Sequence, residues 1–134
     1  MSERQYIEPQ PTAETEVFWN GTKHGKLLVR SCQACGKAHW YPRNHCPLCS
    51  SRDLEWIEAS GDGEVYSYSV MRRADPPYVM AYVTLAEGPT MMTNLVDCDP
   101  DQIRIGDKVH VRFIETPGGA HLPLFCLKSK HNDQ

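Results

Sequence analysis

The sequence predicts a mostly β protein with three parts: a short N-terminal helix, a small metal-stabilised ribbon and a five-stranded barrel. Two Cys-x-x-Cys pairs lie close together in the first half of the chain, at Cys32/Cys35 and Cys46/Cys49. After residue 60, short alternating apolar and polar runs recur between clusters of Gly, Pro and Asp, which is typical of strands joined by turns. The 134 residues suffice for one ordinary domain or two small ones.

Residues 1–22 are predicted to form a polar, mobile lead-in followed by a helix. Thr12 is the expected N-cap, and Glu14 and Glu16 fall in the first turn, where the helix dipole favours acidic side chains. We expect the helix to end near Asn20-Gly21, because glycine commonly follows a helix C-terminus.

The two cysteine pairs predict a four-sulfur metal site in a ribbon spanning residues 23–59. Cys35 and Cys46 are separated by ten residues, so two tight turns can face each other and present Cys32, Cys35, Cys46 and Cys49 to one tetrahedral ion. Zn²⁺ is the expected metal, and iron is the alternative because tetrahedral sulfur also suits iron. Four protein ligands leave no open position, so the metal would be structural.

The cysteines are less well explained as disulfides or as a redox dithiol. Disulfides need an oxidising compartment, whereas the polar, acidic N-terminus lacks a secretory signal, and we therefore expect a cytoplasmic protein. A redox dithiol usually occurs once, within a βαβ unit. His39 and His45 lie near the cysteines but are not needed as ligands, and we expect both to be loop residues. Cys98 and Cys126 are expected to be buried structural thiols.

The strand predictions follow the alternating runs. The ribbon should contain strands at 26–31, 38–41 and 54–57, and Ser60–Gly63 should mark the boundary with the barrel. The barrel, residues 60–128, should contain five strands at 64–70, 78–85, 90–96, 109–114 and 122–127, with one helical turn at 99–103. A long connection between the third and fourth strands suits a barrel of the OB type. Residues 129–134 should form a polar tail.

Charge is unevenly distributed along a chain whose net charge is −3. No Asp or Glu occurs between Val17 and Arg52, and that segment contains six cations: Lys23, Lys26, Arg30, Lys37, Arg43 and Arg52. This excess either binds an anion such as a phosphate, offsets the charge of the thiolate site, or forms a solvated basic face. The acidic C-terminal half disfavours extended contact with nucleic acid.

No motif of a self-sufficient enzyme was found. The sequence contains no GxSxG, HExxH, Walker or GxGxxG pattern. Asp97, Asp99 and Asp101 cluster without the glycine and glutamate of an EF-hand and are expected to form a solvated turn. Arg72-Arg73 could hold a phosphate or could serve solubility. No apolar run is long enough to span a membrane. These observations favour a binding or scaffolding module.

The chain resembles the proteins that join a rubredoxin-like zinc ribbon to an OB-fold and accompany acyl-CoA metabolism, known as domain of unknown function 35 (DUF35). The resemblance runs from about Phe18 to Phe125. Its motifs, in chain order, are Phe18-Trp19, Gly25-Lys26-Leu27, Cys32–Gly36, Tyr41-Pro42-Arg43, Cys46–Cys49, Leu54-Glu55-Trp56, Ser60–Ser67, Glu87-Gly88-Pro89, Ile105–Val109 and Leu122–Phe125.

This resemblance implies a non-catalytic accessory subunit that binds structural zinc and supports acyl-CoA binding or transfer by a thiolase-like or acyltransferase partner. A hydratase of the hot-dog fold is an alternative partner. We further hypothesise that Lys37, Arg43 and Arg72 contact the CoA phosphates, and that Trp40 or Tyr41 stacks on the adenine. The Val17-Phe18-Trp19 cluster either packs on the ribbon or contacts the partner.

Two other functions remain open at this point. Zinc ribbons and OB barrels both commonly bind oligonucleotides, so a single-stranded nucleic-acid-binding module is one alternative. An independent enzyme is the other, although no nucleophile with an adjacent base was recognised. The sequence indicates neither the acyl chain nor the stoichiometry of a complex.

Overall fold

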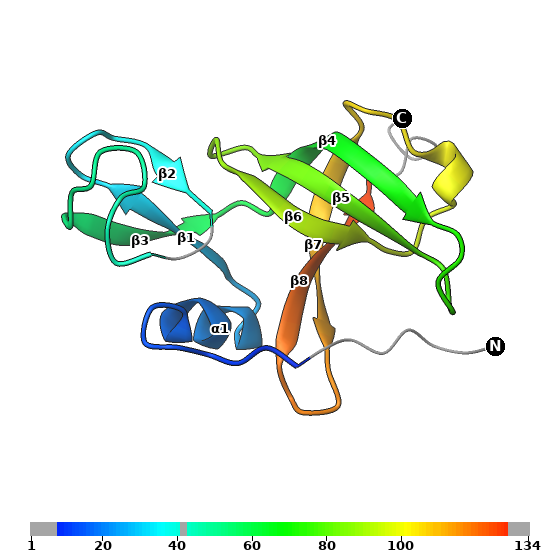
Figure 1. Cartoon of the computed structure of the whole chain (residues 1–134), viewed down its shortest axis with the longest axis horizontal. Coiled ribbons are helices and arrows are strands. Elements are labelled where there is room, and N and C mark those ends of the chain that lie inside the picture. Colours follow the sequence, from blue (N-terminus) through cyan, green and yellow to red (C-terminus); the bar gives the residue numbers. More distant parts are fainter. Residues whose placement is uncertain (1–7, 41–42, 129–134) are drawn as a thin grey trace.

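A computed structural model describes residues 8–40 and 43–128, and it confirms a mostly β fold with one α-helix, a ribbon and a closed barrel (Figure 1). In chain order the elements are α1 (Glu16–Lys23), β1 (Leu27–Cys32), β2 (Ala38–His39), β3 (Leu54–Ala59), β4 (Asp62–Met71), β5 (Tyr78–Leu85), β6 (Thr90–Leu95), the 3-10 helix η1 (Pro100–Gln102), β7 (Lys108–Glu115) and β8 (His121–Leu127).

The ribbon is a three-stranded antiparallel sheet in the order β2-β1-β3. Its central strand, β1, pairs along its whole length with β3, from Leu27↔Ala59 to Cys32↔Leu54. Only two residue pairs, Arg30↔His39 and Ser31↔Ala38, join β1 to β2. A sheet this small buries little apolar surface, so its fold depends strongly on the metal site at its end.

The barrel is closed in the order β4-β5-β6-β8-β7. All of its pairings are antiparallel except that between β6 and β8, which is parallel at Leu95↔Phe125. This is the small five-stranded barrel that the strand pattern predicts, and its strands begin and end within two residues of the predicted positions. The interior is filled by apolar side chains, among them Val65, Val83, Met91, Val109 and Phe125, all almost fully buried.

The helix differs from its prediction at both ends. It begins after Thr15, because the Thr12 carbonyl accepts hydrogen bonds from the N–H groups of Thr15 and Glu16 in a turn that precedes it. It continues through Asn20-Gly21, because Gly21 faces the side chain of Leu28. A Cβ at Gly21 would lie 2.7 Å from Leu28 Cδ1, so this glycine permits close packing and does not stop the helix.

The helix ends instead at Lys23, and Gly25, whose φ is +73°, lies just after the C-cap residue His24. The Lys26 N–H donates to the Gly21 carbonyl at 2.9 Å, and the Gly25 N–H donates to the Thr22 carbonyl at 3.0 Å. This pair of hydrogen bonds is a Schellman motif, which needs a residue with positive φ at the glycine position.

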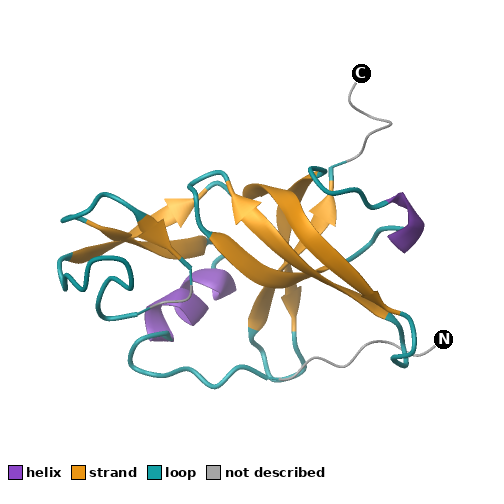
Figure 2. Ribbon diagram, turned by 45° about the horizontal axis from the view of Figure 1, so that its top comes forward, coloured by secondary structure: helices purple, strands orange, loops and turns teal. Residues whose placement is uncertain are grey.

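Helix α1 joins the ribbon to the barrel. Phe18 is completely buried and belongs to one apolar core that also contains Leu27 of the ribbon and Phe125 of the barrel. Its ring meets those of Trp19 and Trp40 edge-on, with centroid separations of 4.9 and 5.0 Å. Figure 2 shows the helix beside the ribbon sheet and near the β7–β8 hairpin. The apolar cluster at residues 17–19 therefore packs mainly within the chain.

The lead-in is anchored from residue 8 onward, in contrast to the predicted mobile segment. The Gly118 N–H in the β7–β8 turn donates to Glu8 Oε2 at 2.9 Å, and the Thr116 hydroxyl donates to Glu8 Oε1. Further along, the Asn44 N–H in the ribbon donates to Glu14 Oε2 at 2.9 Å. The same short segment thus bonds to both the barrel and the ribbon.

Phe18→Ala should destabilise the zinc-loaded chain by about 3–5 kcal/mol, because it opens a cavity where helix, ribbon and barrel share one core. The measurement is chemical unfolding followed by circular dichroism. Val17→Ala is the matched control, since Val17 is exposed on the same helix and should change stability by no more than about 0.5 kcal/mol. Equal effects of the two substitutions would contradict a shared core centred on Phe18.

Candidate metal centre and surrounding surfaces

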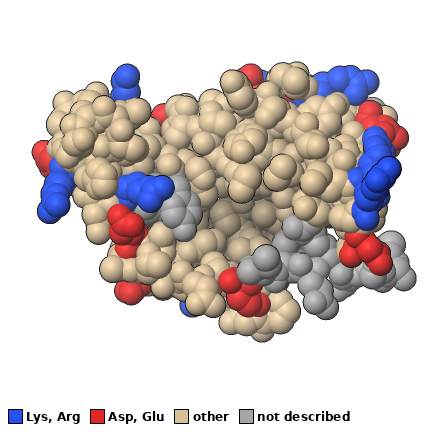
Figure 3. Space-filling model, viewed as in Figure 1, with Lys and Arg blue, Asp and Glu red and all other residues tan. Residues whose placement is uncertain are grey.

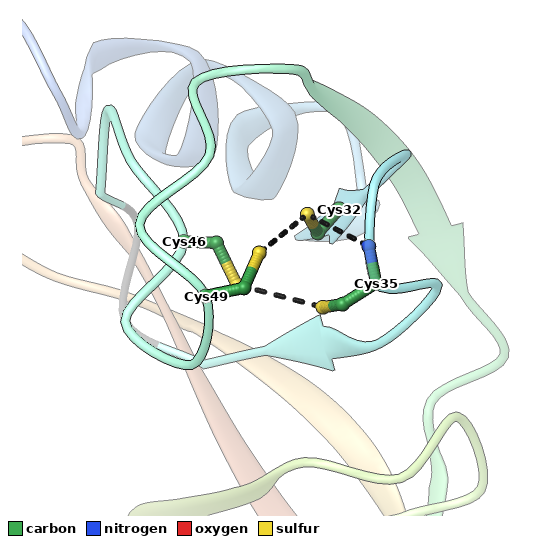
Figure 4. Close-up of side chains that lie close together, drawn as sticks. All are labelled: Cys32, Cys35, Cys46 and Cys49. Carbon is green, nitrogen blue, oxygen red and sulfur yellow. Dashed lines mark hydrogen bonds between the residues drawn. The ribbon is translucent and has the colours of Figure 1, made fainter.

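The four predicted cysteine ligands converge at the end of the ribbon (Figure 4). Cys32 is the last residue of β1, and Cys35 follows in the turn before β2. That turn contains Gly36 at φ +75°, as expected for the knuckle. Cys46 and Cys49 come from the loop between β2 and β3. Ser50, which follows Cys49 in this loop, has a φ of +68°. All four sulfur atoms lie within 4.8 Å of one another.

The sulfur separations fit a tetrahedral metal. Cys32 Sγ lies 3.6 Å from Cys49 Sγ, and Cys35 Sγ lies 3.7 Å from Cys46 Sγ. A tetrahedron with Zn–S bonds of about 2.3 Å requires sulfur atoms about 3.8 Å apart. The donor set is all cysteine, which zinc favours in structural sites, and the four ligands complete the coordination. These residues therefore form a structural zinc site.

Backbone N–H groups support the negative charge of the site. The Cys35 N–H points at Cys32 Sγ and the Leu48 N–H at Cys46 Sγ, each at 3.4 Å. Such contacts surround the metal ligands and hold their orientation. These donors were not predicted from the sequence. The Cys-x-x-Cys spacing could have indicated them, because in each such turn the backbone folds back over the first sulfur.

The four cysteines can all be thiolates at once only when a cation is bound between them. The Cys35 backbone N–H, the largest influence, lowers the pKa of the Cys32 thiol to about 7. The Ser51 N–H favours the Cys49 thiolate, but hydrogen bonding with Cys32 and partial desolvation raise the pKa of Cys49 to about 12. One sulfur thus ionises readily and makes ionisation of its neighbour harder, an imbalance that a bound dication removes.

The two nearby histidines are not part of the sulfur cluster. His39 is a buried residue of β2, which corrects the expectation of a loop residue. Burial is the main cause that lowers the pKa of His39, followed by the positive charge of Arg30. His45 lies in the loop and is exposed, as expected.

The hypothetical CoA contacts lie at two ends of the molecule. Lys37 and Arg43 are exposed on the ribbon, whereas Arg72 follows β4 at the opposite end of the barrel (Figure 1). Arg72 pairs with Asp101 at 3.3 Å. Trp40 is half-buried against Phe18, so part of its ring is already used, and Tyr41 lies outside the described residues. The structure therefore does not gather the four described residues, Lys37, Trp40, Arg43 and Arg72, into one patch.

The three residues of the hypothetical partner contact, Val17, Phe18 and Trp19, differ in exposure. Phe18 is completely buried, so its side chain is withdrawn from the surface. Trp19 is partly buried against the same core, and Val17 is exposed. Any contact through this helix would therefore rely on Val17 and the outer part of Trp19.

The remaining clusters have local roles. Asp99 accepts a hydrogen bond from the Asp101 N–H at 3.0 Å and caps η1. Asp97 pairs with Arg112. Cys98 and Cys126 are half-buried and not fully buried as predicted, and desolvation raises the pKa of Cys98. No helix among residues 8–40 and 43–128 is both long and apolar enough to cross a bilayer.

Fold and site together define a class: a closed four-cysteine zinc ribbon joined to an OB-type barrel. Comparison with known families supports both halves. Residues 19–55 match the family described as "ChsH2, rubredoxin-like zinc ribbon domain", and residues 56–113 match "ChsH2, C-terminal OB-fold domain". A DUF35 domain-containing scaffold protein of Methanothermobacter thermautotrophicus is 40% identical over 108 residues, covering 75% of this chain and 81% of that protein. The chain belongs to the DUF35 family.

Two further relatives carry names connected with enzymes. A probable enoyl-CoA hydratase alpha subunit of Thermomonospora curvata is 36% identical over 126 residues, which cover 89% of this chain but only 40% of that protein. The solved structure entitled "Ltp2-ChsH2(DUF35) aldolase" superimposes with a TM-score of 0.79 at 34% identity, covering 90% of this chain and 98% of that one. This chain is thus similar to a part of one relative and to nearly all of the other.

Cys46→Ser should abolish stoichiometric zinc, because a hydroxyl replaces the thiolate of a buried ligand in a site without spare donors. The wild-type chain should contain one zinc per chain by elemental analysis. Cys126→Ser removes a thiol outside the cluster and should leave the zinc content unchanged. Full zinc occupancy in Cys46→Ser, or stoichiometric iron in wild-type protein, would contradict the assignment.

Proposed function

We propose that this chain is a non-catalytic accessory subunit that supports acyl-CoA binding or transfer for a separate enzyme. The observation that carries this proposal is the closed metal centre within a DUF35 fold. Four cysteine ligands leave the zinc no position for a substrate, so the metal stabilises the ribbon and does not activate a thioester. The hydratase and aldolase in the names of the relatives indicate the kind of enzyme that such a subunit accompanies.

Among partner enzymes, the names of the relatives favour an acyl-CoA hydratase or an aldolase. The thiolase-like partner expected from the sequence stays a prediction. In each case the partner would supply the catalytic groups, and this chain would contribute a binding surface.

The packed barrel restricts where CoA could bind. Because Val65, Met91 and Phe125 are buried in the barrel interior, a CoA arm would lie on the outer surface. The exposed cations Lys37 and Arg43 on the ribbon are our candidates for its phosphates. Arg72 is a weaker candidate, because it follows β4 at the end of the barrel that lies away from the ribbon.

A native purification tests the accessory role. We expect the tagged chain, expressed in its own host, to co-purify with an acyl-CoA enzyme identified by mass spectrometry. Removing the chain should lower that enzyme's turnover, and adding it back should restore turnover, because the chain contributes to substrate binding. The isolated chain should convert no thioester, and turnover by the isolated chain would overturn the proposal.

Charge reversal tests the CoA contacts. Lys37→Glu combined with Arg43→Glu should weaken acyl-CoA binding to the complex at least about tenfold, measured by calorimetry, because two attractive contacts become repulsive. Arg73→Glu at the far end of the barrel is the control with the same charge change per site and should have little effect. Arg72→Glu, measured separately, should have the smaller effect. Unchanged affinity in the double variant would exclude the ribbon cations.

A further inference from the structure

Four of the large hydrophobic side chains that are exposed lie together on the outside of the barrel. Tyr66 of β4, Tyr82 of β5 and Met92 of β6 are 66%, 43% and 55% exposed. Tyr82 lies directly opposite Met92 across β5 and β6, and Ser67, next to Tyr66, lies opposite Tyr82. The three side chains therefore form a row across three neighbouring strands.

Ile105 extends this row at the edge of β4. It precedes Gly106, whose N–H donates to the Val65 carbonyl at 2.8 Å. That hydrogen bond holds the loop beside β4 at the position next to Tyr66, and Ile105 is the most exposed large hydrophobic residue of the group. We call Tyr66, Tyr82, Met92 and Ile105 the barrel-face row.

A β-bulge creates the exposed position of Tyr66. The pairing of β4 with β5 shifts register between Val65 and Ser67, so Tyr66 has no partner residue in the ladder. Strict alternation would place Tyr66 and Tyr68 on the same face. With the bulge, Tyr68 turns inward and donates its hydroxyl to the Ile103 carbonyl at 3.1 Å, while Tyr66 faces solvent. Bulges commonly redirect a side chain next to a functional site.

The strands that carry the centre of the row are uncharged, and nearby charges such as Arg104, next to Ile105, lie at its rim. β5 and β6 contain no Asp, Glu, Lys or Arg, and β4 has none after Glu64. Figure 3 shows the same distribution: charged residues lie toward the ends and margins of this view, and the middle of the barrel face is uncharged. An uncharged centre that is rich in Tyr and Met, with charges at its rim, is the composition of a protein–protein interface core.

This distribution also selects the kind of occupant. In many OB barrels the face of the second and third strands binds oligonucleotides, and here those strands are β5 and β6. Nucleic acid needs cations for its phosphates, and β5 and β6 contain no Lys or Arg. The barrel is closed, so an added strand finds no free edge. What remains is the side-chain surface, which suits an uncharged, apolar face of another folded protein.

We infer that the barrel-face row docks the chain onto the acyl-CoA enzyme itself, through an uncharged apolar surface of that enzyme. This inference rests on the proposed accessory function and adds the contact surface to it. It places docking on the barrel and CoA binding on the basic ribbon, where Lys37 and Arg43 lie. The row takes the role that the sequence analysis gave to Val17, Phe18 and Trp19.

The test uses the complex of this chain with the enzyme identified by co-purification. Tyr82→Lys combined with Met92→Lys places two charges at the centre of the row and should weaken binding to the enzyme at least about tenfold, measured by surface plasmon resonance. Leu48→Lys is the matched control, because Leu48 is 62% exposed on the ribbon, and it should bind within twofold of wild type. Zinc content and unfolding temperature of each variant show that the fold is intact. Tyr66→Ala provides a variant without added charge and should also weaken binding.

The outcomes separate this inference from the proposed function. Loss of binding in folded Tyr82→Lys/Met92→Lys, with binding retained in Leu48→Lys, supports the barrel-face row. Wild-type affinity in that double variant overturns the row and leaves the accessory function standing. Failure of the wild-type chain to bind any acyl-CoA enzyme overturns both. If the wild-type chain is a homodimer that the double variant converts to monomer, the face belongs to a second copy of the chain. If the wild-type chain binds oligothymidylate and Tyr82→Ala abolishes that binding, the face belongs to nucleic acid. Either result would overturn the inference.

Discussion

The convergence of four cysteine sulfurs is the constraint on which the ribbon depends. Its sheet has one two-residue strand and buries little apolar surface, so hydrophobic burial alone leaves the loop between β2 and β3 poorly fixed. A tetrahedral ion bonded to Cys46 and Cys49 fixes that loop to the end of β1 at Cys32. Because metal ligation and folding are coupled, the positions of Lys37 and Arg43 follow from the sulfur geometry.

The second constraint is the shared core around Phe18. A ribbon and a barrel linked only by the residues between Ala59 and Asp62 could change their relative orientation. Phe18 inserts helix α1 into the core formed by both, and Glu8 and Glu14 bond the lead-in to the barrel turn and to the ribbon loop. The relative orientation of the basic ribbon and the uncharged barrel face is therefore fixed by a helix that precedes both in the chain.

The sequence was sufficient for the metal ligands and the strands but not for the details of close packing. Cysteine spacing is a local signal, so the four ligands were predictable, and so were strands in which apolar and polar residues alternate. The prediction that the helix ends near Gly21 is wrong, because a glycine at a helix end and a glycine packed against Leu28 give the same sequence signal. The bulge at Tyr66 has no local signal, since it depends on register with β5. Arg72 was grouped with Lys37 and Arg43 by charge, and only the fold separates them.

Several groups that could bind or react are already engaged within the described part of the chain. The four clustered thiols are committed to one ion, and the barrel interior is filled by apolar side chains. The carboxylates Asp97 and Asp101 pair with arginines. What the described part of the chain leaves open to other molecules is surface: cations on the ribbon and uncharged aromatic and thioether side chains on the barrel. The proposed accessory role rests on this distribution, because the ribbon and the barrel each present a surface that other molecules can contact.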